Sequence, residues 1–168
     1  MCSNSKIIVV DTSIWIDLSK TGLIDLIFNL PYSLIVTDFV LRHEKINNIE
    51  WVILEQKGLT FQELDSQEIA NLYDLFQKHR NISLVDLAMF SVARKMGAIL
   101  LTGDNNLRVF AATELEVHGL LWALDEMVDQ SILNPNLAIS RLSYILELPN
   151  IRLPRNECAQ YIKKWRNK

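Results

Sequence analysis

A helix-to-strand unit at residues 83–106 limits the possible folds more than any other feature of this sequence. Ser83 has the character of a helix N-cap, Asp86 follows in the first turn, and Gly97 ends the helix. Residues 98–101 form an apolar run that is too short for a helix and suits a strand buried on both faces. Because strands buried on both faces are typical of parallel sheets covered by helices, the unit predicts an α/β fold.

Two carboxylates lie at the turning points of this unit. Asp86 is in the first turn of the predicted helix, and Asp104 follows Thr102 and Gly103 at the end of the predicted strand. In a parallel α/β unit these two places lie on the same edge of the sheet, so we expect Asp86 and Asp104 to be neighbours. That edge, at the carboxyl ends of the strands, is where open α/β sheets bind ligands.

The rest of the chain continues the alternation of strands and helices. Short β-branched or apolar runs predict strands at residues 6–10, 33–36 and 115–118. Residues 51–54 also fit a strand, with a turn at Lys57 and Gly58 that leads into residues 59–61. Helical periodicity, capping residues and Pro or Gly stops predict the helices, at residues 14–22, 23–30, 39–46, 66–80, 107–113, 120–128, 136–148 and from 154 onward.

The composition is that of one ordered domain. The chain has 168 residues, of which 49% are hydrophobic, so it can bury a well-filled core. A net charge of -3 excludes a uniformly basic surface, although a local basic patch is compatible with it. Cys2 and Cys158 have no metal-ligand spacing, and the sequence shows no signal peptide or membrane-spanning run. We therefore expect a soluble cytoplasmic protein without a membrane partner.

Carboxylates recur at strand ends or early in the helices that follow, at Asp11, Glu44, Asp86 and Asp104. Two carboxylates about 4 Å apart repel by about 4 kcal/mol at an effective dielectric near 20, so converging acids need protons or a cation. Oxygen ligands without His or Cys suit Mg²⁺ or Mn²⁺ rather than Zn²⁺. Such a site predicts metal-assisted phosphodiester hydrolysis, with the hydroxyls of Ser13 and Thr102 as groups that orient a carboxylate or a bound water.

Each of these acids also has an ordinary structural interpretation. Asp86 completes a Ser-x-x-Asp capping box with Ser83, and the other three acids fit turn or solvent-exposed positions. Asp38 is a weaker alternative to Glu44, because it also follows a predicted strand. Asp17 and Asp25 fit solvent-facing positions on helices.

The basic residues admit two interpretations as well. Arg42 and Arg108 flank proposed acids and are well placed to touch a substrate phosphate. The cations of the tail fit a helix C-terminus, where positive charge interacts favourably with the helix dipole. The alternative is a surface that faces RNA. These cations are Lys163, Lys164, Arg166 and Lys168.

The stretches VVDTSIWIDL, VLRHE and SLVDLAMFSVARKMGAILLTGDNNLR resemble the PIN-domain nucleases, with the T-x-D motif at Thr102 and Asp104 as the most recognisable part. The resemblance covers residues 6–119. It implies a three-layer α/β/α sandwich with a central, mainly parallel sheet, and cleavage of RNA at a site that depends on Mg²⁺ or Mn²⁺. Many bacterial members are toxins that dimerise and are silenced by a small antitoxin, so the resemblance also implies an antitoxin partner and a homodimer. The metal ligands that it implies are Asp11, Glu44, Asp86 and Asp104.

Asn106 departs from the family pattern, because many members have another acid at that place. An amide can bind a metal or a water but supplies no charge, so a weaker second metal site is expected. Residues 120–168 form a C-terminal helical extension, which we expect to pack on the core within a single domain of residues 1–168. The predicted function is a metal-dependent endoribonuclease, and the alternatives are a non-catalytic RNA- or protein-binding scaffold and a nuclease that acts on DNA.

Overall fold

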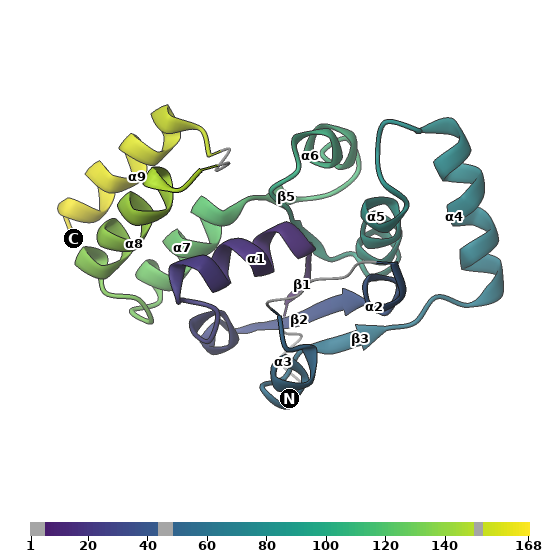
Figure 1. The fold of residues 1–168 in the computed structure, drawn as a ribbon, viewed down its shortest axis with the longest axis horizontal. Coiled ribbons are helices and arrows are strands. Elements are labelled where there is room, and N and C mark those ends of the chain that lie inside the picture. The colour runs from purple at the N-terminus through teal and green to yellow at the C-terminus, as the bar shows by residue number, and fades with distance from the viewer. Residues whose placement is uncertain (1–5, 44–48, 150–152) are drawn as a thin grey trace.

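A wholly parallel sheet of five strands forms the centre of the computed structural model, which describes residues 6–43, 49–149 and 153–168 (Figure 1). The strands are arranged in the order β3-β2-β1-β4-β5, and each neighbouring pair is parallel. Their bounds are β1 Lys6–Val10, β2 Tyr32–Thr37, β3 Thr60–Gln62, β4 Ile99–Leu101 and β5 Val117–His118. The predicted parallel α/β fold is confirmed.

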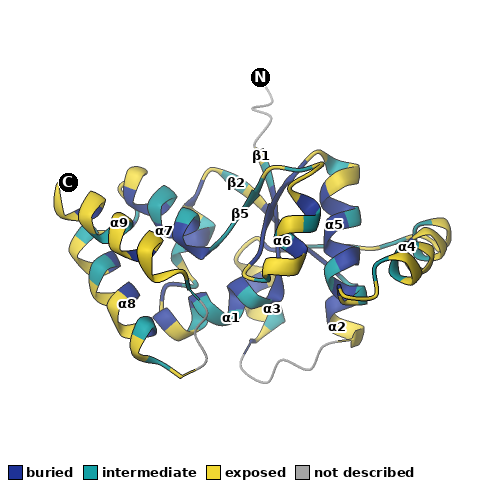
Figure 2. Cartoon of the chain, turned by 90° about the horizontal axis from the view of Figure 1, so that it is seen from above, coloured by how far each residue is buried: buried dark blue, intermediate teal, exposed yellow. Residues whose placement is uncertain are grey.

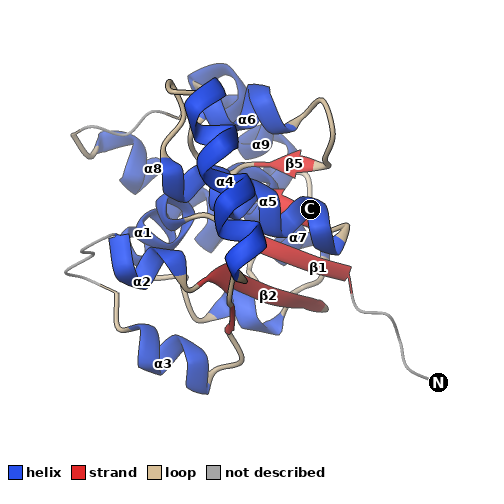
Figure 3. Cartoon of the chain, turned by 90° about the vertical axis from the view of Figure 1, so that its right-hand side faces the viewer, coloured by secondary structure: helices blue, strands red, loops and turns tan. Residues whose placement is uncertain are grey.

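Helices cover both faces of this sheet. One 3-10 helix, η1 Leu26–Asn29, accompanies the α-helices, which are α1 Thr12–Thr21, α2 Phe39–His43, α3 Trp51–Gln56, α4 Ser66–Lys78, α5 Leu84–Met96, α6 Asn105–Ala111, α7 Leu120–Asp129, α8 Pro135–Glu147 and α9 Arg155–Arg166. Helix α5 packs on β1, β2 and β4, and α4 packs on the outer side of α5 (Figure 3). Helices α1 and α7 lie on the other side of the sheet, with α8 and α9 farther out (Figure 2).

The predicted caps of α5 are present. The Ser83 Oγ accepts a hydrogen bond from the backbone N–H of Asp86 at 3.0 Å. Gly97 ends the helix in the left-handed conformation, with φ of 59°, which glycine adopts without a steric penalty. The inner residues of α5 and the strand residues Ile8, Val9 and Val10 are fully buried, so α5 is held rigidly against the sheet.

Two predicted elements are wrong. Residues 51–54 form the beginning of α3 rather than a strand; Leu54 alone of the helix is buried, while Val52 and Ile53 are exposed. The β-branched residues favour a strand locally, but the contact of one helix face with the core decides the conformation. Within residues 23–30 only the short 3-10 helix η1 forms instead of a full α-helix. The tighter winding of a 3-10 helix allows Leu23, Ile27 and Leu30 all to be buried before the chain reaches Pro31.

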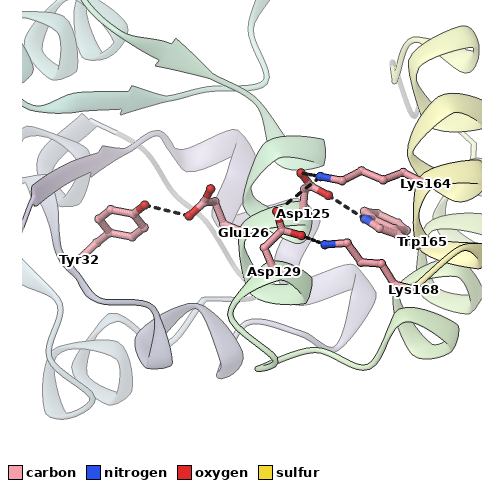
Figure 4. A network of polar contacts seen from close by, with 7 residues as sticks. All are labelled: Tyr32, Asp125, Glu126, Asp129, Lys164, Trp165 and Lys168. Carbon is pink, nitrogen blue, oxygen red and sulfur yellow. Dashed lines mark hydrogen bonds and ion pairs between the residues drawn. The ribbon is translucent and has the colours of Figure 1, made fainter.

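The last helix is fastened to α7 by polar contacts (Figure 4). The Trp165 indole N–H donates to Asp125 at 2.9 Å, and the Lys164 ammonium donates to the same carboxylate at 2.6 Å. Lys168 pairs with Asp129. Trp165 is 1% exposed, so these contacts surround a buried aromatic side chain.

Residue Glu126, also on α7, ties this assembly to the sheet, because it accepts a hydrogen bond from the Tyr32 hydroxyl of β2 at 2.8 Å (Figure 4). Burial first, and then Glu126, raise the pKa of Tyr32 to about 12, so the phenol remains a donor at neutral pH.

None of the helices in the described parts of the chain has the length and apolar character that spanning a membrane requires.

Candidate active site

Asp11 lies directly after β1 and is fixed by two hydroxyl groups. Its Oδ2 accepts hydrogen bonds from Ser13 Oγ at 2.6 Å and from Thr102 Oγ1 at 2.8 Å. The backbone N–H of Asp11 donates to Leu101 at 2.8 Å, because β1 and β4 are neighbours and end together. Asp11 is 3% exposed and Thr102 is fully buried. Two donors on one oxygen hold this carboxylate in a single orientation.

The same hydroxyls also accept hydrogen bonds, which sets the direction in which each donates. Gly103 N–H donates to Ser13 Oγ at 2.9 Å, and Asp104 N–H donates to Thr102 Oγ1 at 3.0 Å. A Cβ atom on Gly103 would lie 3.0 Å from Ser13 Oγ, so the close approach of the turn after β4 to the first turn of α1 favours a small residue there. The turn after β4 and the first turn of α1 therefore form one connected network around Asp11.

Asp104 begins α6 as its N-cap. Its Oδ1 accepts a hydrogen bond from the Leu107 backbone N–H at 2.8 Å. The helix start thus fixes one oxygen of Asp104, while the backbone N–H of Asp104 binds Thr102. Asp11 and Asp104 are consequently joined through a single side chain, that of Thr102.

The Asp86 carboxyl group at this edge of the sheet has a raised pKa. Burial in the first turn of α5 and the nearby charges of Asp11 and Asp104 raise the pKa of Asp86 to about 6, although hydrogen bonds with Ser83 act in the opposite direction. The repulsion from Asp11 and Asp104 means that the three carboxylates are close enough to interact electrostatically. The expected proximity of Asp86 and Asp104 follows the geometry of the parallel unit.

The fourth predicted acid, Glu44, lies outside the described residues. Among the described residues, no three His, Cys, Asp or Glu side chains form a group that could hold a metal ion. The donor set still has the chemistry that Mg²⁺ or Mn²⁺ requires, since Asp11, Asp86 and Asp104 offer carboxylate oxygens. Burial first, and then the charges of Asp11 and Asp104, raise the pKa of Asp86, and a bound cation would favour the ionised form against both effects.

Other predicted residues have different surroundings. Asp38, the alternative to Glu44, pairs with Arg42 at 3.0 Å one helical turn later, so this arginine is engaged with an acid. Asn106 is exposed in the first turn of α6. Two of the four tail cations, Lys164 and Lys168, are engaged with α7, whereas Lys163 and Arg166 are exposed.

A cavity of about 620 Å³ adjoins the Asp11 network. Ser13 and Gly103 belong to both, and the cavity extends between α1, α6 and the beginning of α9. Its charged and amide residues are Asp17, Asn105, Arg108 and Glu157, and its apolar residues are Ile16, Leu120, Leu153 and Pro154. Asp17, which we expected to face solvent, is half-buried in this lining, and burial raises its pKa while Lys20 opposes the shift.

Sequence reasoning missed the part of this cavity that Asp17 and Glu157 form. Asp17 lies four residues after Ser13, a spacing that places both on one side of α1, and this signal was available. Glu157 comes from the far end of the chain, and local patterns carry no information about its position beside α1.

Arg108 separates the carboxylates from the C-terminal helices. Its Nη2 donates to the Thr102 carbonyl at 3.0 Å, whereas its buried Nε has no hydrogen-bond partner within the described structure. A Cβ atom on Gly119 would lie 2.7 Å from the same Nη2, so the guanidinium occupies the space that a side chain at position 119 would need. Arg108 therefore has a fixed place against the end of β4.

The chain was compared with known proteins, and the match to a family model covers nearly its whole length. A family model described as a PIN domain matches residues 7–167. The chain is similar to a crystal structure of PAE2754 from Pyrobaculum aerophilum. The alignment covers 74% of this chain and 91% of that one, with 13% sequence identity and a TM-score of 0.49. No curated protein matches the chain.

Proposed function

Because the chain belongs to the PIN-domain family, we propose that it is a metal-dependent endoribonuclease that hydrolyses RNA phosphodiester bonds. The observation that carries the proposal is the electrostatic coupling of Asp86 with Asp11 and Asp104 at the carboxyl ends of the parallel strands. A fold gains no stability from carboxylates that repel one another, so this arrangement is better explained by a ligand that they hold in common.

We propose Asp11, Asp86 and Asp104, together with Glu44, as the ligands of Mg²⁺ or Mn²⁺. Bound there, the metal would neutralise the phosphodiester and lower the pKa of water. The contribution of the chain itself is preorganisation. Ser13 and Thr102 orient Asp11, and the start of α6 orients Asp104.

The direct test is cleavage of a mixed single-stranded RNA by the purified protein in Mg²⁺, in Mn²⁺ and in chelator. The variants are Asp11→Asn and Asp104→Asn, and the matched control is Asp74→Asn, an exposed residue of α4. Asn keeps the oxygen that accepts the hydrogen bonds of Asp11 and Asp104, so both variants should fold. We expect metal-dependent cleavage by the wild type and the control, and its loss in both variants.

Several outcomes of this assay would contradict the proposal. If the wild type cleaves nothing in either metal and carries no co-purified inhibitor, a non-catalytic RNA- or protein-binding scaffold becomes the better explanation. Equal cleavage by wild type and Asp104→Asn would show that the activity arises elsewhere. A parallel reaction with single-stranded DNA of the same sequence distinguishes a ribonuclease from a nuclease without sugar preference.

We also propose that the protein is the toxin of a toxin-antitoxin pair, that it acts in the cytoplasm, and that it forms a homodimer. Support for a protein partner comes from a groove of about 760 Å³ between α2, α3 and β3. Leu41 and Val52, which line the groove, are 48% and 66% exposed. Co-expression with the product of an adjacent short reading frame should yield a stable complex without nuclease activity, and an unchanged activity would contradict the toxin assignment.

A further inference from the structure

We propose that the cavity between α1, α6 and the start of α9 binds the base of a nucleotide that flanks the scissile phosphate, and that it prefers guanine. This inference rests on the proposed nuclease function. The cavity adjoins the catalytic edge directly, because Ser13 and Gly103 line it while belonging to the hydrogen-bond network of Asp11. A phosphate held at the carboxylates would therefore have its neighbouring nucleotide beside this cavity.

The size and apolar lining of the cavity suit a base. A volume of about 620 Å³ falls in the usual range for small-ligand sites. Ile16 and Leu120 contribute apolar surface from α1 and α7, and Leu153 and Pro154 contribute it from the segment that leads into α9. Unstacked bases of single-stranded RNA are commonly held against such side chains while their edges are read by polar groups.

The charges of the described lining residues disfavour a phosphate as the occupant of the cavity. Two carboxylates, Asp17 and Glu157, line it, and within the described part of the chain neither makes a hydrogen bond or an ion pair. Among the described residues that line the cavity, the one cation is Arg108, and one of its N–H groups donates to the Thr102 carbonyl. An anionic group would meet more repulsion than attraction there, whereas an uncharged base with donor groups would be attracted.

Guanine is the base whose donors fit this lining. A carboxylate only accepts hydrogen bonds, and guanine presents its N1–H and its 2-amino group side by side on one edge. Adenine and cytosine place a ring acceptor beside their amino group, and uracil places its single N–H between two carbonyls. The N–H groups of Arg108 that do not bind the Thr102 carbonyl are donors of the type that guanine O6 and N7 accept in nucleic-acid complexes.

Cleavage-site mapping on a randomised single-stranded RNA tests the proposal. We expect the wild type to cut with guanine enriched roughly tenfold at one position beside the cut, as is typical of a paired base contact. Asp17→Asn and Glu157→Gln each replace a pure acceptor by an amide, so the ratio of cuts at guanine to cuts at adenine should fall severalfold in each. Glu147→Gln, an exposed change of the same type at the end of α8, should keep the wild-type ratio.

A binding measurement separates this inference from the nuclease proposal. Uncleavable 2'-O-methyl hexamers of uridine with one central guanosine or adenosine are titrated by fluorescence polarisation against the wild type, Glu157→Gln and Glu147→Gln. We expect the wild type to bind the guanosine hexamer more tightly than the adenosine hexamer, and Glu157→Gln to abolish this difference. That result would support a base-binding cavity even if no RNA is cut. Cleavage without a guanine preference, or a preference that survives both Asp17→Asn and Glu157→Gln, overturns the inference while leaving the nuclease intact.

Discussion

The raised pKa of Asp86 makes a prediction about stability that does not depend on any substrate. Burial, and then the charges of Asp11 and Asp104, raise this pKa from its usual 3.8 to about 6. An acid with a raised pKa in the folded state stabilises the fold only while it is protonated. The stabilisation is fully present below pH 3.8 and is lost as the pH rises through 6. At neutral pH the ionised Asp86 therefore lowers the free energy of unfolding.

The magnitude follows from the two pKa values. The ionisation costs at most about 3 kcal/mol at pH 7.5 and about 0.5 kcal/mol at pH 4, where the folded state holds its proton and the unfolded state loses part of its own. Asp86→Asn removes the charge and keeps the size of the side chain. We therefore expect the variant to be more stable than the wild type at pH 7.5 in chelator, with a gain that nearly disappears at pH 4.

Urea unfolding of both proteins at these two pH values measures the effect. Millimolar Mg²⁺ or Mn²⁺ should raise the wild-type unfolding free energy at pH 7.5 and narrow the gap, because a ligand of the folded state stabilises it by mass action. Asp74→Asn on α4 is the control for a change of net charge. A difference that is the same at pH 4 and pH 7.5, or a variant that is less stable at pH 7.5, would refute the reasoning.

Two further substitutions test the elements around the cavity. Trp165→Phe removes the indole N–H that binds Asp125 in the interior, so we expect urea unfolding to show a loss of about 2 kcal/mol, whereas an unchanged midpoint would mean that this contact does not anchor α9. Gly119→Ala places a Cβ 2.7 Å from the Arg108 Nη2, so the guanidinium must shift and its hydrogen bond to the Thr102 carbonyl is weakened. We expect a loss of about 1 kcal/mol by the same assay, and wild-type stability would show that Arg108 moves without penalty.

The sequence was most informative where local chemistry and fold agree. Ser83 and Gly97 delimit α5, and the buried run after Gly97 forms β4, so the relation of Asp86 to Asp104 could be predicted from one short stretch. The pairing of Ser13 and Thr102 with Asp11 has the same origin, because β1 and β4 end side by side. These are consequences of parallel topology and need no further information.

Sequence reasoning failed where distant parts of the chain decide the outcome. Val52 and Ile53 have a local preference for a strand, and only the docking of Leu54 explains why α3 forms. Glu157 is far from Asp17 in the sequence, and the two line one cavity because α9 packs on α7 and α8. No pattern of spacing predicts such a meeting, which depends on the packing of whole helices.

The anchoring of α9 has a consequence for how this molecule could change over time. At the C-terminal end of α9, Trp165 and Lys164 bind Asp125 of α7. At its N-terminal end, Pro154 and Glu157 line the cavity. The hydrogen bonds that orient Asp11 come instead from Ser13 and Thr102. Mutations in the first turn of α9 can therefore change the cavity wall while the hydrogen bonds that orient Asp11 stay in place, so the proposed base preference and the proposed metal site could change independently.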